Sequence, residues 1–431
     1  MNELTKKLVE AVKNDLTPSL GVTEPGAIAY AAAAAARALG GGIRSVRVKL
    51  NSCIYKNSFT CAVPGTDGMG CALAAALGAV MGDPGRKLMA TEEATPEDIE
   101  KANALVRGGR ATAELADISP KVFIEATVET ENGYATAVIE GRHDVLVRIS
   151  VNGRDVFIKD AAGEGPERFR VSSVSFSDLL EAVGEAEGLE FFDGAISMNM
   201  RLYEEGLKNG LMPLTEARCP EGASAAETAE WIACGAIEAR VRGAAAPAMA
   251  LTGSGSHGIL ATLPVYAAAQ AHNAGEVLLR RALLLSALVT TYIKELSGLL
   301  STACGCVLAG GTGAALGISY VMAMTRDRRP DENELYAILF RALNSMAASV
   351  TGMICHGGNT GCSLKAAIGV KMAFASAEMA VKGAGAESVH GILGFTPEET
   401  MRNMGRIASD MLPVERSILD IMNCKSDGCL I

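Results

Sequence analysis

Alternating apolar and polar side chains mark a group of strands in the first 160 residues. Residues 45–51 (SVRVKLN) alternate in this way and predict one strand. Residues 121–160 predict two hairpins, one turning at residues 131–133 (ENG) and the other at residues 152–153 (NG). Asn-Gly steps favour the tight turns that join antiparallel strands. We therefore expect a small sheet with antiparallel hairpins in this region.

Helical spacing of apolar residues accounts for most of the remaining chain. Before the hairpins, helices are expected over residues 2–15, 23–40, 71–82 and 96–107. After Phe176 no segment alternates convincingly, and residues 161–169 predict a linker. We therefore expect an α+β fold in which a small α/β domain precedes a larger all-helical domain. The expected division places the N-terminal helices and the small α/β domain in residues 1–175, and the all-helical domain in residues 176–431.

One apolar stretch is long enough to cross a membrane. Residues 301–324 contain no charged side chain. The stretch is nevertheless rich in Gly, Ala, Ser and Thr, and it lacks a flanking basic cluster or aromatic belt. We expect buried helices in a soluble core, and no membrane partner.

Composition and charge narrow the classes of partner. The 431 residues carry a net charge of −10 with no locally basic run, which argues against a nucleic-acid partner. Aromatic residues make up only 4% of the chain, which favours closely packed helices. The N-terminal segment is charged and amphipathic and resembles no secretory signal, so we expect a cytoplasmic protein. Homo-oligomerisation is left open.

The chain contains eleven cysteines, which should be reduced thiols in the cytoplasm. Five lie singly in apolar surroundings and are expected to be inert core residues: Cys53, Cys61, Cys71, Cys219 and Cys234. Cys424 and Cys429 lie in what is expected to be a frayed C-terminal tail.

Three further cysteines, Cys304, Cys355 and Cys362, lie on glycine-rich stretches, and Cys306 follows the first of them closely. This spacing matches neither the ferredoxin run nor paired zinc knuckles. Spacing alone leaves two interpretations open, namely a metal or cluster site and close packing of small residues.

Two segments could bind an anion. Gly253, Ser254, Gly255, Ser256 and His257 stand immediately before an expected helix, whose free N–H groups could attract a carboxylate or phosphate. The alternative is an ordinary capped helix start. Lys56 and Asn57 follow the end of the first strand, where the lysine could hold a carboxylate or simply be solvated.

Several ordered motifs resemble the L-cysteine desulfidase (UPF0597-like) family, which is related to the alpha part of iron–sulfur L-serine dehydratases. The resemblance covers nearly the whole chain. It is carried by TEPGAIAYAAA (23–33), YKNSFTCAVPGT (55–66), TGSGSHG (252–258), STACG (301–305), GMIC (352–355), SLKAAIGV (363–370) and MRNMGRIASDML (401–412).

This resemblance implies a pyridoxal-independent lyase that converts L-cysteine, or a related β-substituted amino acid, to pyruvate, ammonia and hydrogen sulfide. It also implies a [4Fe-4S] cluster held by Cys304, Cys355 and Cys362, with Cys306 as an extra thiol. The small amino-acid substrate would be bound through its carboxylate by Lys56, Asn57 and the loop residues Gly253, Ser254, Gly255 and Ser256. His257 or His356 would move a proton, because an imidazole titrates near neutral pH.

Two departures from the family pattern support a second interpretation. Val22 stands where the family usually has a cysteine, and His356-Gly357-Gly358-Asn359 replaces a usual Asp-Gly-Ala-Lys. The alternative is therefore a catalytically altered or inactive paralogue that binds an amino acid. A structural zinc site is a third hypothesis.

Overall fold

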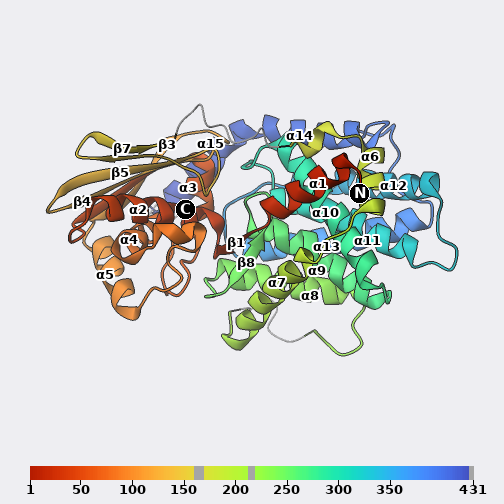
Figure 1. Ribbon diagram of the computed structural model, residues 1–431, viewed down its shortest axis with the longest axis horizontal. Coiled ribbons are helices and arrows are strands. Elements are labelled where there is room, and N and C mark those ends of the chain that lie inside the picture. Colours follow the sequence, from red (N-terminus) through yellow and green to blue (C-terminus); the bar gives the residue numbers. More distant parts are fainter. Residues whose placement is uncertain (160–168, 212–218, 427–431) are drawn as a thin grey trace.

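A computed structural model describes residues 1–159, 169–211 and 219–426 of the chain. It consists of a smaller part built on a sheet and a larger, mainly helical part, which lie side by side (Figure 1). The predicted α+β class, with antiparallel hairpins before a larger helical region, is confirmed. Of the predicted linker at residues 161–169, all but Phe169 lies outside the described residues.

The smaller part contains a six-stranded sheet in the order β3-β2-β4-β5-β6-β7. The predicted hairpins are β4–β5 and β6–β7, and β2 pairs antiparallel with β4. β3 was not predicted, because this edge strand is mostly exposed and shows no apolar alternation; it pairs parallel with β2. The strands are β2 (Ser45–Asn51), β3 (Ala111–Asp117), β4 (Phe123–Thr130), β5 (Gly133–Glu140), β6 (Leu146–Val151) and β7 (Arg154–Ile158).

Helices cover one face of this sheet (Figure 1). The alternate residues Val46, Val48 and Leu50 of β2 point into the apolar core that α2 and α4 complete. A short helix that the sequence analysis missed, α3, follows β2 directly and carries Lys56 and Asn57. The helices of this part are α2 (Thr23–Leu39), α3 (Ser52–Ser58), α4 (Cys71–Met81), the 3₁₀ turn η1 (Pro84–Met89) and α5 (Pro96–Arg107).

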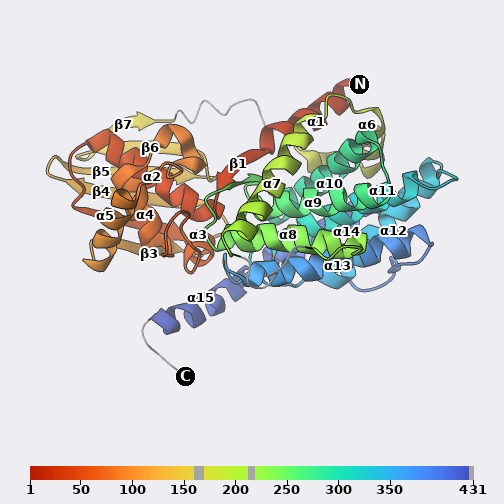
Figure 2. The ribbon, with the colours of Figure 1, turned by 90° about the horizontal axis from the view of Figure 1, so that it is seen from below.

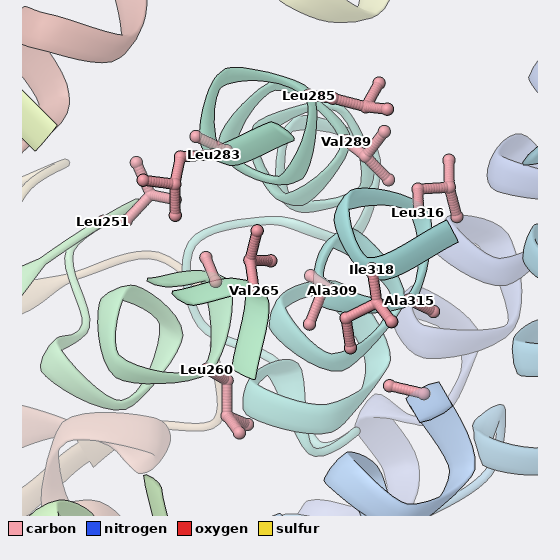
Figure 3. Close-up of a cluster of buried hydrophobic side chains, with 14 of the residues drawn as sticks. Leu251, Leu260, Val265, Leu283, Leu285, Val289, Ala309, Ala315, Leu316 and Ile318 are labelled. Atoms are coloured by element: carbon pink, nitrogen blue, oxygen red, sulfur yellow. The ribbon is translucent and has the colours of Figure 1, made fainter. Parts of the chain in front are cut away.

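The larger part packs its helices around a core formed chiefly by α9, α10 and α11, which is shown in Figure 3. The apolar segment Cys306–Met324 belongs to this core, and 89% of its most apolar window is buried inside the protein, as expected for a soluble helical core. The helices are α1 (Glu3–Asp15), η2 (Val171–Ser173), α6 (Phe176–Glu185), α7 (Phe191–Lys208), α8 (Ala225–Val241), α9 (Gly255–Ala271), α10 (Glu276–Ser297), the π-helical turn η3 (Cys306–Gly311), α11 (Thr312–Met324), α12 (Glu332–Val350), α13 (Gly361–Val381), α14 (Pro397–Asp410) and α15 (Leu412–Ser426).

The larger part was expected to be entirely helical, but it contains a short strand. β8 (Pro247–Ala250) pairs antiparallel with β1 (Thr17–Leu20), and each strand has only four residues, too few to show alternation. In this two-stranded ribbon, Leu20 at the end of β1 lies opposite Pro247, and Thr17 lies opposite Ala250 at the end of β8. The ribbon therefore joins two segments that are more than two hundred residues apart in the sequence.

Two helices connect the parts. α1 comes first in the chain, but its apolar face lies in the core of the helical part, against α6 and α10. α15 leaves the helical part and reaches α3, as Figure 2 shows. The division of the chain at residue 175 into two domains remains a prediction.

Candidate active site

Cys304 lies on the loop between α10 and η3, the first cysteine loop, and Cys355 lies on the loop between α12 and α13, the second cysteine loop. A short antiparallel bridge joins the two loops. Ala303 pairs with Ile354 at its centre. The Cys304 N–H donates to the Met353 carbonyl and the Cys355 N–H donates to the Thr302 carbonyl, each at 2.7 Å. Two of the three predicted cluster cysteines are therefore held next to each other by backbone hydrogen bonds.

Cys362 and Cys306 complete a group of four thiols. Cys362 lies in the first turn of α13, with its Sγ atom 3.3 Å from the Gly357 carbonyl. Burial raises its pKa to about 11, and the nearby Cys355 and Cys304 side chains add to this effect. The Cys306 thiol hydrogen-bonds to Cys304, which lowers the pKa of Cys304 to about 6 and raises that of Cys306. Cys304 is thus the thiolate of this pair.

Two buried lysines lie beside these thiols. Lys365 of α13 donates to the Ile354 carbonyl at 3.3 Å. Burial alone would lower its pKa, but the surrounding cysteines, with Cys304 and Cys355 foremost, outweigh burial and raise it. Burial lowers the pKa of Lys294 on α10 to about 8, although the nearby cysteines, with Cys306 foremost, oppose the shift. Sequence analysis missed both residues, because a lysine on an amphipathic helix is expected to be solvated.

Cysteine thiolates are the ligands that iron–sulfur clusters take. In the described ranges, no three His, Cys, Asp or Glu side chains converge closely enough to hold one metal ion. An iron–sulfur cluster instead binds each cysteine through a different iron atom, so its thiolates need not meet at one point. The buried lysine ammonium groups would offset the negative charge of such a site.

Lys56 already has an internal partner. Its side chain is completely buried, and Nζ lies 2.7 Å from Oε2 of Glu415 on α15. The Thr302 hydroxyl donates to the same carboxylate oxygen at 3.1 Å. The alternative that Lys56 is solvated is therefore wrong, because the approach of α15 covers it. The Glu415 carboxylate on α15 thus links α3 to the loop that carries Cys304.

Asn57 connects the cysteines to the start of α2. Its Oδ1 accepts from the Cys355 thiol at 3.5 Å, and its Nδ2 donates to Oε1 of Glu24 at 2.7 Å. The Gly358 N–H donates to the Asn57 carbonyl at 3.1 Å. A Cβ atom added to Gly358 would lie 3.1 Å from Cγ1 of Val22. Val22 therefore adjoins the loop that carries Cys355.

His356 lies on the same loop and is half-buried. Its Nδ1 atom is 3.2 Å from Nδ2 of Asn359. Burial, together with the charge of Lys365, lowers the pKa of His356. The side chain is therefore a neutral base at the rim of the thiol group.

His257 is buried in the first turn of α9 and lies against the first cysteine loop. Its Nδ1 atom is 2.7 Å from the Thr252 hydroxyl oxygen. A Cβ atom added to Gly305 would lie 2.8 Å from His257 Nε2 and 3.0 Å from Lys294 Nζ. Burial lowers the pKa of His257 well below its usual value, and the charge of Lys294 adds to the shift. His257 is consequently a neutral imidazole.

The glycines just before and at the start of α9 were expected to lie against a bound anion, but side chains of the protein lie against two of them. The space of a Cβ at Gly253 is taken by His143, whose Nδ1 would be 3.1 Å away, and that at Gly255 by Arg240, whose Nε would be 2.5 Å away. These glycines therefore admit two basic side chains of the protein. The Ser254 hydroxyl does not cap the helix, whereas the Ser256 hydroxyl accepts from Arg240 at 2.9 Å.

Most of the isolated cysteines are core residues, as predicted. Cys53, Cys71 and Cys234 are buried, and Cys219 is half-buried. Cys61 is also buried, but its thiol accepts from the Val22 N–H and interacts electrostatically with Cys362. Cys424 is exposed on α15, and Cys429 lies outside the described residues.

Comparison with known proteins gives consistent matches over most of the chain. The family described as serine dehydratase alpha chain matches residues 86–419. A UPF0597 protein of Clostridium botulinum is 37% identical over 429 residues, which cover 96% of this chain and 98% of that protein. UPF0597 proteins of Caldanaerobacter subterraneus (33% over 430 residues) and Geobacter sulfurreducens (32% over 425 residues) each match 96% of this chain and 97% of their own length. These three names state no activity.

Proposed function

This chain belongs to the serine dehydratase alpha-chain family, and from that membership we propose that it is an iron–sulfur-dependent, pyridoxal-independent lyase. The proposed reaction eliminates sulfide from L-cysteine, or the β-substituent from a related amino acid, and gives pyruvate and ammonia. The observation that carries the proposal is the group of four thiols flanked by two buried lysines. We place the enzyme in the cytoplasm, without a nucleic-acid or membrane partner.

Cys304, Cys355 and Cys362 would hold a [4Fe-4S] cluster, with Cys306 as a neighbouring thiol. When bound, such a cluster supplies a Lewis-acidic iron that makes the β-substituent a better leaving group. Lys294 and Lys365 would stabilise the negative charge of the thiolates in the buried site.

His257 is the favoured proton acceptor because of its hydrogen bonds. The Thr252 hydroxyl donates to the Leu251 carbonyl at 2.7 Å, so its oxygen accepts the Nδ1–H of His257. The lone pair then lies on Nε2, which faces the Cys304 loop. His356, at the rim of the thiol group, is the second candidate.

The proposed chemistry balances without a redox partner. A base takes the Cα proton, and the electron pair of that bond forms the Cα=Cβ double bond. The Cβ–S bond breaks with its electron pair on sulfur, which leaves as sulfide. Water then converts the released aminoacrylate, through its imine tautomer, to pyruvate and ammonia.

The residues predicted to bind the substrate take different parts in this proposal. Asn57 and the loop Gly253–Ser256 would orient the amino acid beside the cysteines. Lys56 acts as a positioning residue, because its ammonium group is paired with Glu415 and its neighbour Asn57 contacts Cys355.

The test is product formation by full-length protein that has been purified and reconstituted with iron and sulfide without oxygen. We expect pyruvate and sulfide in equal amounts from L-cysteine, and loss of both in Cys355→Ala. L-serine, assayed in parallel, identifies the preferred leaving group. No pyruvate from any β-substituted amino acid, by a protein that contains the cluster, would contradict the proposed activity.

That negative result would favour the second candidate, an altered paralogue that binds an amino acid without turnover. The observation in its favour is Val22, which adjoins Gly358 and is buried at the position where the resemblance leads us to expect a thiol.

A further inference from the structure

Arg240 is a buried cation that lacks a carboxylate partner. It lies near the end of α8 and is only 3% exposed. Its guanidinium donates to the hydroxyls of Ser256 at 2.9 Å and Thr23 at 3.2 Å. Across residues 1–159, 169–211 and 219–426, no carboxylate lies within ion-pairing distance of it, and its Nε has no hydrogen-bond partner. Hydroxyl groups alone leave a buried guanidinium poorly compensated.

A buried carboxyl group without an ion pair among the described residues lies close to it. Glu24 directly follows Thr23 at the start of α2 and is 7% exposed. Its carboxylate accepts from the Asn57 amide at 2.7 Å, and among the described side chains it forms no ion pair. Both Glu24 and Arg240 act electrostatically on the buried His143, so all three groups share one region.

Arg240 and Glu24 are each held by a different contact. Arg240 is packed against Gly255 at the start of α9, while Glu24 is tied to α3 through Asn57. The β1–β8 ribbon fixes α2 and α9 relative to each other. Two opposite charges that are buried in one region but kept from pairing suit a ligand that carries both charges.

We propose that Arg240 and Glu24 form a receptor for the zwitterionic head group of an α-amino acid. Arg240 binds the α-carboxylate, because a guanidinium matches a carboxylate in shape and charge. Glu24 binds the α-ammonium group. The assignment rests on the proposed function, whose substrate it would orient beside the Cys355 thiol through Asn57.

His143 supplies a second, independent observation for a ligand at this place. It comes from the loop between β5 and β6, packs against Gly253 and is 4% exposed. Its Nε2 atom is buried without a hydrogen-bond partner in the described part of the chain. A carboxylate oxygen bound near Arg240 would give this nitrogen a partner.

The experiment measures binding without turnover, on full-length protein prepared without oxygen. L-alanine has both charges but no leaving group, propionate lacks the amine, and ethylamine lacks the carboxylate. Calorimetric titration should show that wild-type protein binds L-alanine more tightly than either single-charge probe. Arg240→Gln should weaken L-alanine binding by at least about tenfold, the usual effect of losing a hydrogen-bonded charge. Ethylamine binding should be unchanged in that variant.

Glu24→Gln should give the opposite result, with ethylamine lost and propionate retained. Arg242→Gln is the matched control, since Arg242 lies on the same helix end and is paired with Glu238 at 3.1 Å. This variant should bind L-alanine as the wild type does. Circular dichroism of each variant separates loss of binding from loss of folding, and Arg240→Lys, which keeps the charge, should retain part of the affinity.

Unchanged L-alanine affinity in folded Arg240→Gln, or no binding by the wild type, overturns the receptor. Because L-alanine has no leaving group, this result is independent of catalysis. Binding that depends on Arg240 together with absent pyruvate production would support the receptor and contradict the lyase.

Discussion

Lys56 and Arg240, two of the buried cations near the cysteines of this protein, differ in what surrounds them. Lys56 is completely buried and lies 2.7 Å from the Glu415 carboxylate. Arg240 is buried almost as deeply, yet within the described residues its side-chain hydrogen bonds go to the hydroxyls of Thr23 and Ser256 and it has no carboxylate partner. The Lys56 charge is paired with a carboxylate of the protein, whereas we assign the Arg240 charge to the carboxylate of a ligand. Burial alone therefore does not distinguish a structural cation from a binding cation, but the partner does.

The largest expected effect is a loss of stability when the buried Lys56–Glu415 ion pair is broken. Lys56→Met leaves the Glu415 carboxylate buried without its cation and should lower the free energy of unfolding by about 3–5 kcal/mol. Arg240→Met removes a charge that has no internal counter-charge, so it should cost far less. Urea denaturation of the two variants at neutral pH makes the comparison.

An exposed pair of similar length is the control. Lys101 and Glu97 on α5 are 2.8 Å apart, but their side chains are 57% and 78% exposed. Lys101→Gln should leave the urea midpoint unchanged, because water screens such pairs. If Arg240→Met destabilises the protein as much as Lys56→Met does, the distinction between the two cations is wrong.

A smaller effect concerns the pH dependence of the free energy of unfolding that comes from His257. Burial lowers the pKa of His257 well below 6.5, so the unfolded chain binds the extra proton more readily than the folded protein. Stability should therefore fall as the pH falls from about 6.5 toward the lower folded value, by up to about 1.4 kcal/mol per pH unit for this residue. His257→Gln should remove that part of the slope.

Unfolding free energies of wild type and His257→Gln between neutral and mildly acidic pH test this expectation. His390→Gln is the control, since His390 is exposed. Equal slopes for wild type and His257→Gln would show that the imidazole is not held neutral by the fold.

Much of the fold could be predicted from local pattern. The helices α2, α4 and α5, the strand β2 and both hairpins follow from periodicity and turn residues. The elements that were missed are short or exposed. β1 and β8 have four residues each, and β3 presents mostly polar residues to solvent.

The candidate site was predicted only in part, for a related reason. Glycine-rich surroundings distinguish Cys304, Cys355 and Cys362 in the sequence itself. Arg240 and Glu415 resemble ordinary solvated helix residues, and only the approach of distant elements buries them. A local sequence pattern cannot predict the contacts of Arg240 with Thr23 and of Glu415 with Lys56, because the partners are more than two hundred positions apart. That Cys306 is not itself a cluster ligand remains a prediction, because its thiol hydrogen-bonds to Cys304, which is expected to be one.

The most direct test of the account is the iron and acid-labile sulfide content of protein reconstituted without oxygen. We predict about four iron atoms and four sulfide ions per chain for the wild type and for Cys306→Ala. Cys304→Ala, Cys355→Ala and Cys362→Ala should each lose most of both. Wild-type protein that takes up no iron, or a folded triple variant that retains it, would contradict a cluster at these thiols.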